Sequence, residues 1–375
     1  MKICKKVCKK MLVLACGTLL ACGIVTAVYA ENLPELTDAD KKYLIKLGYY
    51  NCDHMTTAPV AEAVGIYKDL GLNVEVTGNG KVPEAMAAAQ MDAGYVSNRV
   101  VMLAFLKGAP VVIAANNHSG GSYYLVVSNA LATAEDTLGK KMAIGMEPEK
   151  YNPSWVRMAR RLNLPLEGSN YEVFNMSDKD EYFAMKVGQL DGYTACDPWA
   201  SMAIYEKTGH ILDVDEPSLL SEEDQGICCT YAMRQSFIKD HPVLAHRMTI
   251  AHVRGMKYLY THPVECAEIF AKAYSVPFEV GLMTIHRKTV FEGRTLTWKI
   301  DRKNWENEIR YLIEIGNFEQ SPDLDKLLYT KLLEESQADD FDAFIKNEVD
   351  ELFPVGMPYE EWKAKAYAAE GRAPD

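Results

Sequence analysis

The sequence predicts a two-lobed α/β fold in which each lobe has a mostly parallel sheet flanked by helices. From residue 43 the chain alternates short strand patterns with helical ones, and the same order restarts after residue 140. A short motif supports the repetition, because Gln90 to Tyr95 nearly recurs as Gln189 to Tyr193. The length of 375 residues also suits two cores. Two such lobes leave a cleft between them, where we expect a small molecule to bind.

The first lobe is expected to open with a strand over 43–50 and a helix that begins near Pro59 and ends at Gly71. Proline is favoured in the first turn of a helix and glycine just past its end, which sets these two boundaries. The strand over 73–77 alternates polar and apolar side chains, as a half-buried strand does. The other elements of this lobe follow in the order helix 83–90, strand 92–97, helix 100–106 and buried strand 111–115.

The second lobe is expected to repeat this order before the chain returns to the first. Its predicted elements are strand 141–146, helix 153–162, strand 171–175, helix 179–188, strand 191–195, helix 198–208 and strand 211–214. The returning chain is predicted to form strand 227–233, helices 242–259, 263–274 and 301–315, and an amphipathic, acidic tail from Leu324. We therefore divide the chain into an export segment (1–30), the first part of lobe 1 (41–125), lobe 2 (126–230), and a return to lobe 1 with a helical C-terminal extension (231–375).

The first thirty residues have the pattern of an export signal. Five lysines within 2–10 precede an uncharged apolar stretch over 11–30, and this order is typical of a secretory signal peptide. The end of the stretch fits cleavage after Ala30, whereas residues 19–23 resemble a lipobox with Cys22 as the acylated residue. An uncleaved membrane anchor is the third interpretation, because a span needs about 20 apolar residues. All three place the rest of the chain outside the cytoplasmic membrane, in the periplasm or lipid-anchored on the outer face of that membrane.

The composition narrows the possible functions. A formal net charge of −12 argues against sequence-independent nucleic-acid binding, which needs a basic face. The sequence contains no Ser/His/Asp elbow, phosphate loop or HExxH pattern. Of the nine cysteines, those beyond residue 30 are odd in number and irregularly spaced, so they do not indicate a disulfide framework.

The run from Gly65 to Val76 resembles the opening of the solute-binding proteins of ABC importers for sulfonates, taurine, nitrate and thiamine precursors. The likeness covers roughly residues 43–290, and it continues at 88–95, 107–111, 138–143, 188–192 and 237–242. It implies the type II periplasmic-binding-protein fold, with the ligand in a cleft between the lobes. It also implies a monomer whose partners are a small molecule and the permease in the cytoplasmic membrane. No nucleic-acid partner, enzyme activity or cofactor is expected.

Two alternatives to this function remain open. The same family contains the eukaryotic synthase that builds the thiamine pyrimidine and sacrifices its own histidine. The run from Gly226 to Thr230 lies where that enzyme has a cysteine-rich iron-binding segment, but the helix that should hold the histidine begins with Arg99 to Met102 and contains none. The second alternative is a carrier of a metal or metal chelate that uses Cys52, His54, Cys196 and Cys228.

The candidate ligand-binding residues lie in loops that follow predicted strands, because ligands of α/β sheets bind beyond the carboxyl ends of the strands. The loop after the first strand enters a helix N-terminus, which suits an anion, and Arg99 can form a bidentate pair with a sulfonate or carboxylate. Aromatic side chains with polar tips suit the walls of a cleft. The full set is Cys52, Asp53, His54, Met55, Ser97, Asn98, Arg99, His118, Tyr123, Tyr151, Trp155, Asp197, Trp199 and Cys228.

A metal site would need soft ligands from both lobes to converge. Cys52, His54, Cys196 and one of Cys228 and Cys229 all fall at predicted strand ends or on the returning strand. Because adjacent side chains on a strand point to opposite faces, we expect only one member of that last pair to face the cleft. The spacing matches no compact metal motif, and cysteine is also a common buried core residue.

Overall fold

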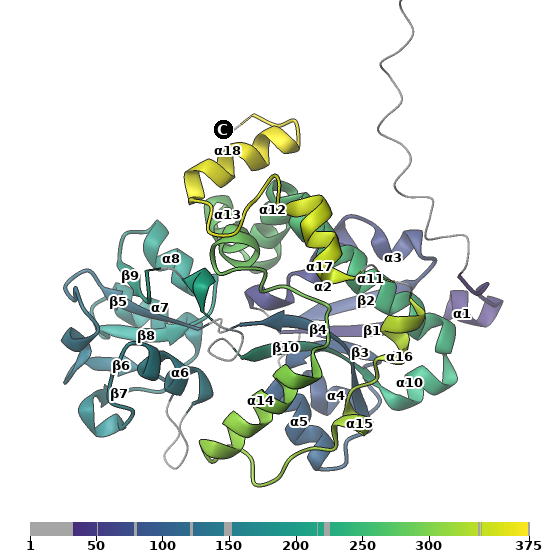
Figure 1. The fold of residues 1–375 in the computed structure, drawn as a ribbon, viewed down its shortest axis with the longest axis horizontal. Coiled ribbons are helices and arrows are strands. Elements are labelled where there is room, and N and C mark those ends of the chain that lie inside the picture. The colour runs from purple at the N-terminus through teal and green to yellow at the C-terminus, as the bar shows by residue number, and fades with distance from the viewer. Residues whose placement is uncertain are drawn as a thin grey trace, which may run out of the picture.

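The computed structural model describes residues 33–373, apart from Asn51, 79–80, 121–122, 146–151, 216, 221–225, 337 and 339. Within this part of the chain two five-stranded sheets lie side by side, and helices cover their faces (Figure 1). This is the predicted two-lobed α/β fold with a helical C-terminal region. No helix among the described residues is both long and apolar enough to cross a membrane. The expected export segment, with Cys22 and Ala30, lies outside the described residues.

The sheet of lobe 1 is built from β1 (Leu44–Tyr49), β2 (Asn73–Gly78), β3 (Ala93–Ser97), β4 (Val111–Ser119) and β10 (Ile227–Arg234). These strands lie in the order β2-β1-β3-β10-β4. β1 pairs in parallel with β2 and β3, whereas β10 is antiparallel to both of its neighbours. The helix α1 (Asp38–Lys42) precedes β1, and the helices between the strands are η1 (Asp53–Met55), α2 (Thr57–Ala63), α3 (Ile66–Asp69), α4 (Val82–Ala87) and α5 (Asn98–Leu106).

The sheet of lobe 2 is built from β5 (Tyr124–Ser128), β6 (Lys141–Ala143), β7 (Glu172–Val173), β8 (Gly192–Ala195) and β9 (Gly209–Leu212). These strands lie in the order β7-β6-β8-β5-β9. β6 pairs in parallel with β7 and β8, and β5 is antiparallel to β8 and β9. The accompanying helices are η2 (Glu135–Thr137), α6 (Pro153–Arg161), η3 (Gly168–Asn170), α7 (Asp178–Lys186), α8 (Trp199–Tyr205) and η4 (Pro217–Leu219).

The antiparallel strand of each sheet is the one that the chain enters when it changes lobes. β5 follows β4 of lobe 1, and β10 follows β9 of lobe 2. The sequence patterns missed β5, because Tyr124 to Val127 are all buried and therefore show no alternation of apolar and polar side chains. Each sheet is thus mixed, with a single antiparallel strand beside parallel ones.

The short sequence repeat corresponds to equivalent positions in the two lobes. The carboxylate of Asp92 accepts a hydrogen bond of 3.0 Å from the backbone N–H of Lys46, at the start of β3. The carboxylate of Asp191 accepts one of 3.0 Å from the backbone N–H of Lys141, at the start of β8. The repeated aspartate therefore has the same task in both sheets, which is to join two neighbouring parallel strands.

The predicted helix from Pro59 to Gly71 is interrupted. Gly65 has a φ of 80°, in the left-handed region that glycine adopts without strain, and it separates α2 from α3. The helical periodicity of the sequence continues across this glycine, and for that reason the pattern did not reveal the break.

The C-terminal region is helical and packs on both lobes. Its elements are α10 (Gln235–Asp240), α11 (Pro242–Thr261), α12 (Pro263–Tyr274), α13 (Phe278–His286), η5 (Arg287–Phe291), α14 (Arg302–Glu314), α15 (Leu324–Leu327), α16 (Lys331–Glu335), α17 (Phe341–Phe344), η6 (Ile345–Val349) and α18 (Tyr359–Ala369). The tail buries Phe344 and Trp362 in the core of lobe 1. α13 lies against α8 of lobe 2, and Glu308 of α14 lies 2.8 Å from Arg157 of lobe 2.

Two consecutive cations just after α13 join the lobes. Lys288 Nζ lies 3.2 Å from Asp53 Oδ2 of lobe 1. Arg287 Nη1 lies 3.5 Å from Asp197 Oδ2 of lobe 2. Lys288 also donates a hydrogen bond to the hydroxyl of Tyr124 on β5. All five side chains are buried. We call Arg287, Lys288 and their two aspartates the interlobe clamp.

The interlobe clamp makes a prediction about stability. Changing Lys288→Met would leave the carboxylates of Asp53 and Glu292, which lie 3.2 and 3.1 Å from Nζ, without their buried cation. Breaking a buried charge pair costs about 3–5 kcal/mol, so we expect the free energy of unfolding to fall by that amount. Urea unfolding followed by circular dichroism measures it.

The matched control is Lys326→Met. Lys326 pairs with Asp323 on the surface, where the lysine side chain is 76% exposed, and exposed pairs add little to stability. We expect this variant to unfold like the parent. A Lys288→Met variant that is as stable as the control would contradict the role given to the interlobe clamp.

Candidate functional site

A cavity of about 630 Å³ opens between the lobes and is lined by residues from both. Lobe 1 contributes the loop after β1, the start of α5 and the start of β10. Lobe 2 contributes the N-terminal ends of α6, α7 and α8. Helix N-termini carry unpaired backbone N–H groups and favour negative charge. The cavity is therefore built to receive polar or anionic groups from a ligand held between the lobes.

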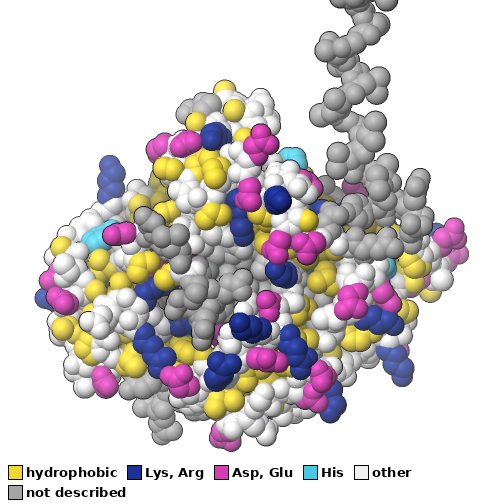
Figure 2. Space-filling model, in the orientation of Figure 1, with side chains coloured by type: hydrophobic (Ala, Val, Ile, Leu, Met, Phe, Trp, Pro, Cys, Tyr) yellow, Lys and Arg dark blue, Asp and Glu magenta, His cyan; other side chains and the backbone are white. Residues whose placement is uncertain are grey.

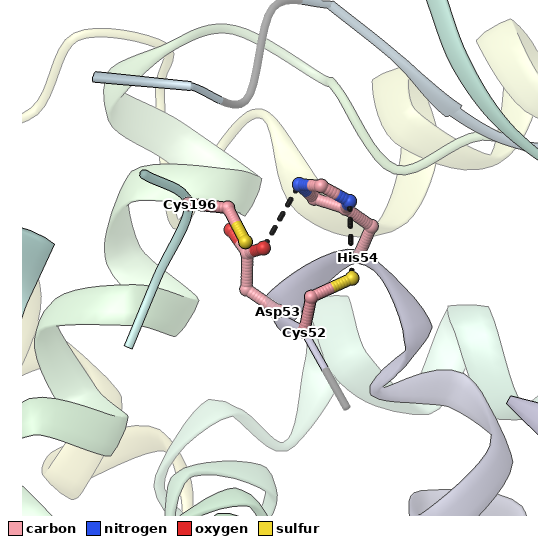
Figure 3. Close-up of side chains that lie close together, drawn as sticks. All are labelled: Cys52, Asp53, His54 and Cys196. Atoms are coloured by element: carbon pink, nitrogen blue, oxygen red, sulfur yellow. Dashed lines mark hydrogen bonds and ion pairs between the residues drawn. The ribbon is translucent and has the colours of Figure 1, made fainter. Parts of the chain in front are cut away.

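His54 is the centre of a group of thiols in this cavity. Its Nδ1 atom lies 3.4 Å from Cys52 Sγ, 3.4 Å from Cys229 Sγ and 3.8 Å from Cys228 Sγ. The Sγ atom of Cys196, from lobe 2, lies within 4.8 Å of ligand atoms of Cys52 and His54, beside them in Figure 3. We call these five residues the thiol–imidazole cluster. It brings soft ligand atoms from both lobes together.

Both Cys228 and Cys229 face His54, which corrects the expectation that only one of them would. The register of β10 against β4 shifts between Ile227 and Cys229 and again between Cys229 and Thr230. Such an irregularity inserts an extra residue into one strand and turns its side chain away from the regular alternation. The two Sγ atoms consequently lie only 3.3 Å apart.

Two buried side chains hold His54 in place. Asp53 Oδ1 lies 2.8 Å from Nε2 of the ring (Figure 3), and the His118 ring stacks on it with the centroids 4.6 Å apart. A carboxylate beside Nε2 favours a proton on that nitrogen. The other nitrogen, Nδ1, is the one that faces the sulfur atoms.

The cluster alters the acidity of its own members. The hydrogen bond with the Cys196 thiol, together with nearby His54, lowers the pKa of Cys52 to about 7 despite burial. The hydrogen bond with the Cys229 thiol and the charge of His54 hold the pKa of Cys228 well below its usual range. Burial opposes a charge on His54, but Asp53 and the neighbouring thiols raise its pKa well above 6.5. The hydrogen bond with Cys52 raises the pKa of Cys196, and burial raises the pKa of Cys229. Only Cys52 and Cys228 therefore favour the thiolate beside the charged His54 ring.

The wall of the cavity is more basic than the chain as a whole. Arg157 and Arg161 are each paired with a carboxylate at 2.8 Å. Arg99 forms no ion pair with any residue that the structure describes, and its Nε atom is buried without a hydrogen-bond partner. On the opposite wall Lys179 Nζ lies 6.0 Å from the ring of Trp199. On the face of the molecule shown in Figure 2, acidic and basic side chains are interspersed among the described residues.

Most of the predicted ligand-binding residues lie at this cavity. Asn98 also joins the start of α5 to β10, because its Nδ2 donates a hydrogen bond of 2.7 Å to the carbonyl of Ile227. Asp53 and His118 lie directly behind the lining and contact His54. The predicted residues that line the cavity are Cys52, His54, Ser97, Asn98, Arg99, Tyr123, Trp199 and Cys228.

Two further described residues of the predicted set, Trp155 and Asp197, lie away from the lining. Trp155 is fully buried in the core of lobe 2, because α6 turns its apolar face to that core and Arg157 and Arg161 to the cavity. Asp197 is fully buried, accepts a hydrogen bond of 2.8 Å from the backbone of Ser201 and belongs to the interlobe clamp. Tyr151 and the side chain of Met55 lie outside the described residues.

Several residues of the site were not predicted. Asp178 and Lys179 line the cavity at the start of α7, and the strand-to-helix rule used for the other loops would have found them. Glu308 lines it from α14, and Lys288 supports it from η5. No local pattern marks these last two, since only the packing of the C-terminal region brings them to the cleft.

Comparison with known proteins agrees with this architecture. A model of the NMT1-like family matches residues 168–275. No curated protein matches the chain in sequence.

Three solved structures show the fold. A zinc-bound ligand-binding component of an ABC-type import system from Staphylococcus aureus superposes with a TM-score of 0.65 at 12% identity, over 80% of this chain and 100% of its own. The nitrate-binding NrtA of Synechocystis PCC 6803 gives 0.64 at 16% identity, over 90% and 100%. The aliphatic sulphonate-binding SsuA of Escherichia coli gives 0.61 at 14% identity, over 77% and 98%.

The same fold also occurs in the desulfurization enzyme DszB, so the fold alone does not separate carriers from enzymes. The family model matches a segment of this chain's sequence. The three binding proteins share its two-lobed architecture. The chain has the type II periplasmic-binding-protein fold, and it resembles the solute-binding proteins of ABC importers, as its sequence predicted.

Proposed function

We propose that the protein is an extracytoplasmic solute-binding protein that delivers a small solute with an anionic group to the permease of an ABC importer. Sulfonates such as taurine, nitrate and thiamine-precursor-like molecules are the solute classes to which its sequence resemblance points. The protein binds without catalysis, as a monomer, in the periplasm or lipid-anchored on the outer face of the cytoplasmic membrane. The cavity that both lobes line supports this proposal.

Arg99 is the observation that carries the proposal. The guanidinium group presents N–H donors in a planar fork that matches two oxygens of a sulfonate or carboxylate. Its Nε is buried at the cavity without a protein partner, and a buried donor is costly unless a ligand or water accepts from it. Arg99 is also the second residue of α5, where the helix dipole adds positive potential. The lobe 1 wall therefore offers a preformed anion site.

Lobe 2 supplies the opposite wall. Trp199 and Lys179 contribute an aromatic surface and a second cation, and Tyr123 lies at the crossover between the lobes. A solute that pairs with Arg99 and contacts these residues stabilises the closed arrangement of the lobes, because it interacts with both walls only when they are close. The permease would then recognise the closed form.

The proposal predicts the effect of changing Arg99→Gln. Glutamine keeps a polar side chain but removes the charge and the bidentate fork, so we expect the affinity for the solute to fall about 10- to 100-fold, which corresponds to a charged hydrogen bond of about 1.5–3 kcal/mol. A thermal-shift screen of sulfonates, nitrate, carboxylates and pyrimidines identifies the solute, because binding raises the melting temperature. Isothermal titration then measures both affinities.

The control variant is Arg302→Gln. Arg302 lies at the start of α14, is 54% exposed and pairs with Glu306 on the surface. It should bind the solute with the affinity of the parent. An Arg99→Gln variant with the same affinity as this control, or a screen in which no anionic solute raises the melting temperature, would overturn the proposed anion site.

A further inference from the structure

The thiol–imidazole cluster lies in the same cavity, but an anion anchored on Arg99 has no need of it. Thiolates and imidazole are the ligands that proteins use for soft transition-metal ions. We propose that the cluster binds one thiophilic metal ion, Zn²⁺ or Cu⁺, through Cys52, His54, Cys228 and Cys229, and that Cys196 brings lobe 2 against the bound Cys52 thiolate without being a fifth ligand.

The distances from His54 Nδ1 to three sulfur atoms fit those between the ligands of a tetrahedral site. Bonds of about 2.3 Å to sulfur and about 2.0–2.1 Å to nitrogen place the ligand atoms of a tetrahedron about 3.5–3.8 Å apart. The three sulfur atoms of Cys52, Cys228 and Cys229 lie 3.4, 3.8 and 3.4 Å from His54 Nδ1. Cys228 Sγ and Cys229 Sγ lie 3.3 Å apart, so Cys52 Sγ would have to move toward this pair for all four atoms to reach one ion. The set of three thiolates and one imidazole is soft and carries the negative charge that a cation needs.

The surroundings of His54 are those of a metal-binding histidine. Such histidines usually direct their other nitrogen to a carboxylate, which sets the tautomer and the orientation of the ring. Asp53 Oδ1 has this position, 2.8 Å from Nε2, and Lys288 holds the second carboxylate oxygen at 3.2 Å. The bulge in β10 supplies two of the ligands, because it turns both Cys228 and Cys229 toward His54 Nδ1.

Cys266 shows how an ordinary buried cysteine of this chain differs. It lies in α12 within the core of lobe 1, and its thiol donates only a long contact of 3.7 Å to the carbonyl of Tyr258. The cysteines of the cluster instead face one another and an imidazole, at a cavity through which an ion can enter. Packing accounts for Cys266, but not for the convergence of the other four.

The site also connects the lobes. Cys52, Cys228 and Cys229 belong to lobe 1, whereas Cys196 follows β8 of lobe 2. A Cys52 thiolate bound to the ion lies within reach of Cys196 in the arrangement of the lobes seen here, since the Cys196 Sγ is within 4.8 Å of ligand atoms of Cys52 and His54. The bound ion would thus favour the closed form.

Titration of the reduced, metal-stripped protein with Zn²⁺ alone, in competition with a chromophoric chelator, tests the site. We expect one equivalent to bind, and Co²⁺ to give the strong visible absorption of tetrahedral thiolate coordination. The double change Cys228→Ser and Cys229→Ser should lower the affinity for Zn²⁺ at least about 100-fold, because half of the ligands are lost. Cys52→Ser, at a half-buried position, is a second variant that should weaken binding in the same way.

Cys266→Ser is the matched control and should bind Zn²⁺ like the parent. Circular dichroism of the metal-free variants shows that each is folded. No bound equivalent in the parent, or an equal affinity in the Cys266→Ser and the Cys228→Ser, Cys229→Ser proteins, would overturn the metal site. The result is separate from that for the anion site, because Arg99→Gln should leave the affinity for Zn²⁺ alone unchanged.

Small-angle X-ray scattering tests the connection between the lobes. We expect Zn²⁺ to reduce the radius of gyration of the parent and of Cys266→Ser, because the metal-bound Cys52 thiolate would contact the Cys196 thiol of lobe 2. Cys196→Ser should still bind one equivalent but should lose most of this compaction. A Cys196→Ser protein that contracts as much as the parent would show that Cys196 does not bring lobe 2 against the bound Cys52 thiolate.

Discussion

The arrangement of the site depends on one buried carboxylate, that of Asp53. It lies between His54 and Lys288, at 2.8 and 3.2 Å, and a buried carboxylate is tolerated only where partners surround it. Lys288 comes from the C-terminal region and Asp53 from the loop after β1, so the cleft takes this form only when the last third of the chain has packed. The neighbouring Arg287 contacts Asp197 of lobe 2 at 3.5 Å. Two adjacent cations therefore position one aspartate in each lobe.

The turn that carries these cations is a π-helix, η5. Wider helical turns of this kind occur often at functional sites, because they redirect side chains without ending the helix. Here consecutive residues reach different lobes. A regular strand-to-helix loop, by contrast, places its side chains on the lobe to which it belongs.

The cleft combines two kinds of chemistry. Its walls carry Arg99 and Lys179, although the chain has a net charge of −12. The lining has four cations and the two carboxylates of Asp178 and Glu308, and an excess of positive charge in a concave site attracts anionic solutes despite the global balance. Deeper in the cavity the thiol–imidazole cluster offers soft ligands in place of hydrogen-bond donors. The two ligands proposed above, a hard anion and a soft cation, would therefore use different side chains of the cleft.

The local sequence determined most elements and the loops that face the cleft. Cys52, His54 and Arg99 were identified because each follows a strand, and parallel strands end at one edge of a sheet. Hydrophobic patterning also predicted α12 with its observed limits, because proline and the apolar stripe mark them. It missed β5 and the break at Gly65, where burial on both faces or an unbroken periodicity hides the structure.

Tertiary structure alone decided which side chains meet. The sequence could not show that Cys228 and Cys229 point the same way, since the bulge arises from the pairing of β10 with β4. Nor could it place Lys288 beside Asp53, because the two residues are 235 positions apart in sequence and meet only in the folded chain. Local periodicity reports which face of an element is buried. The partner on that face is set by long-range packing, which no pattern of neighbouring residues encodes.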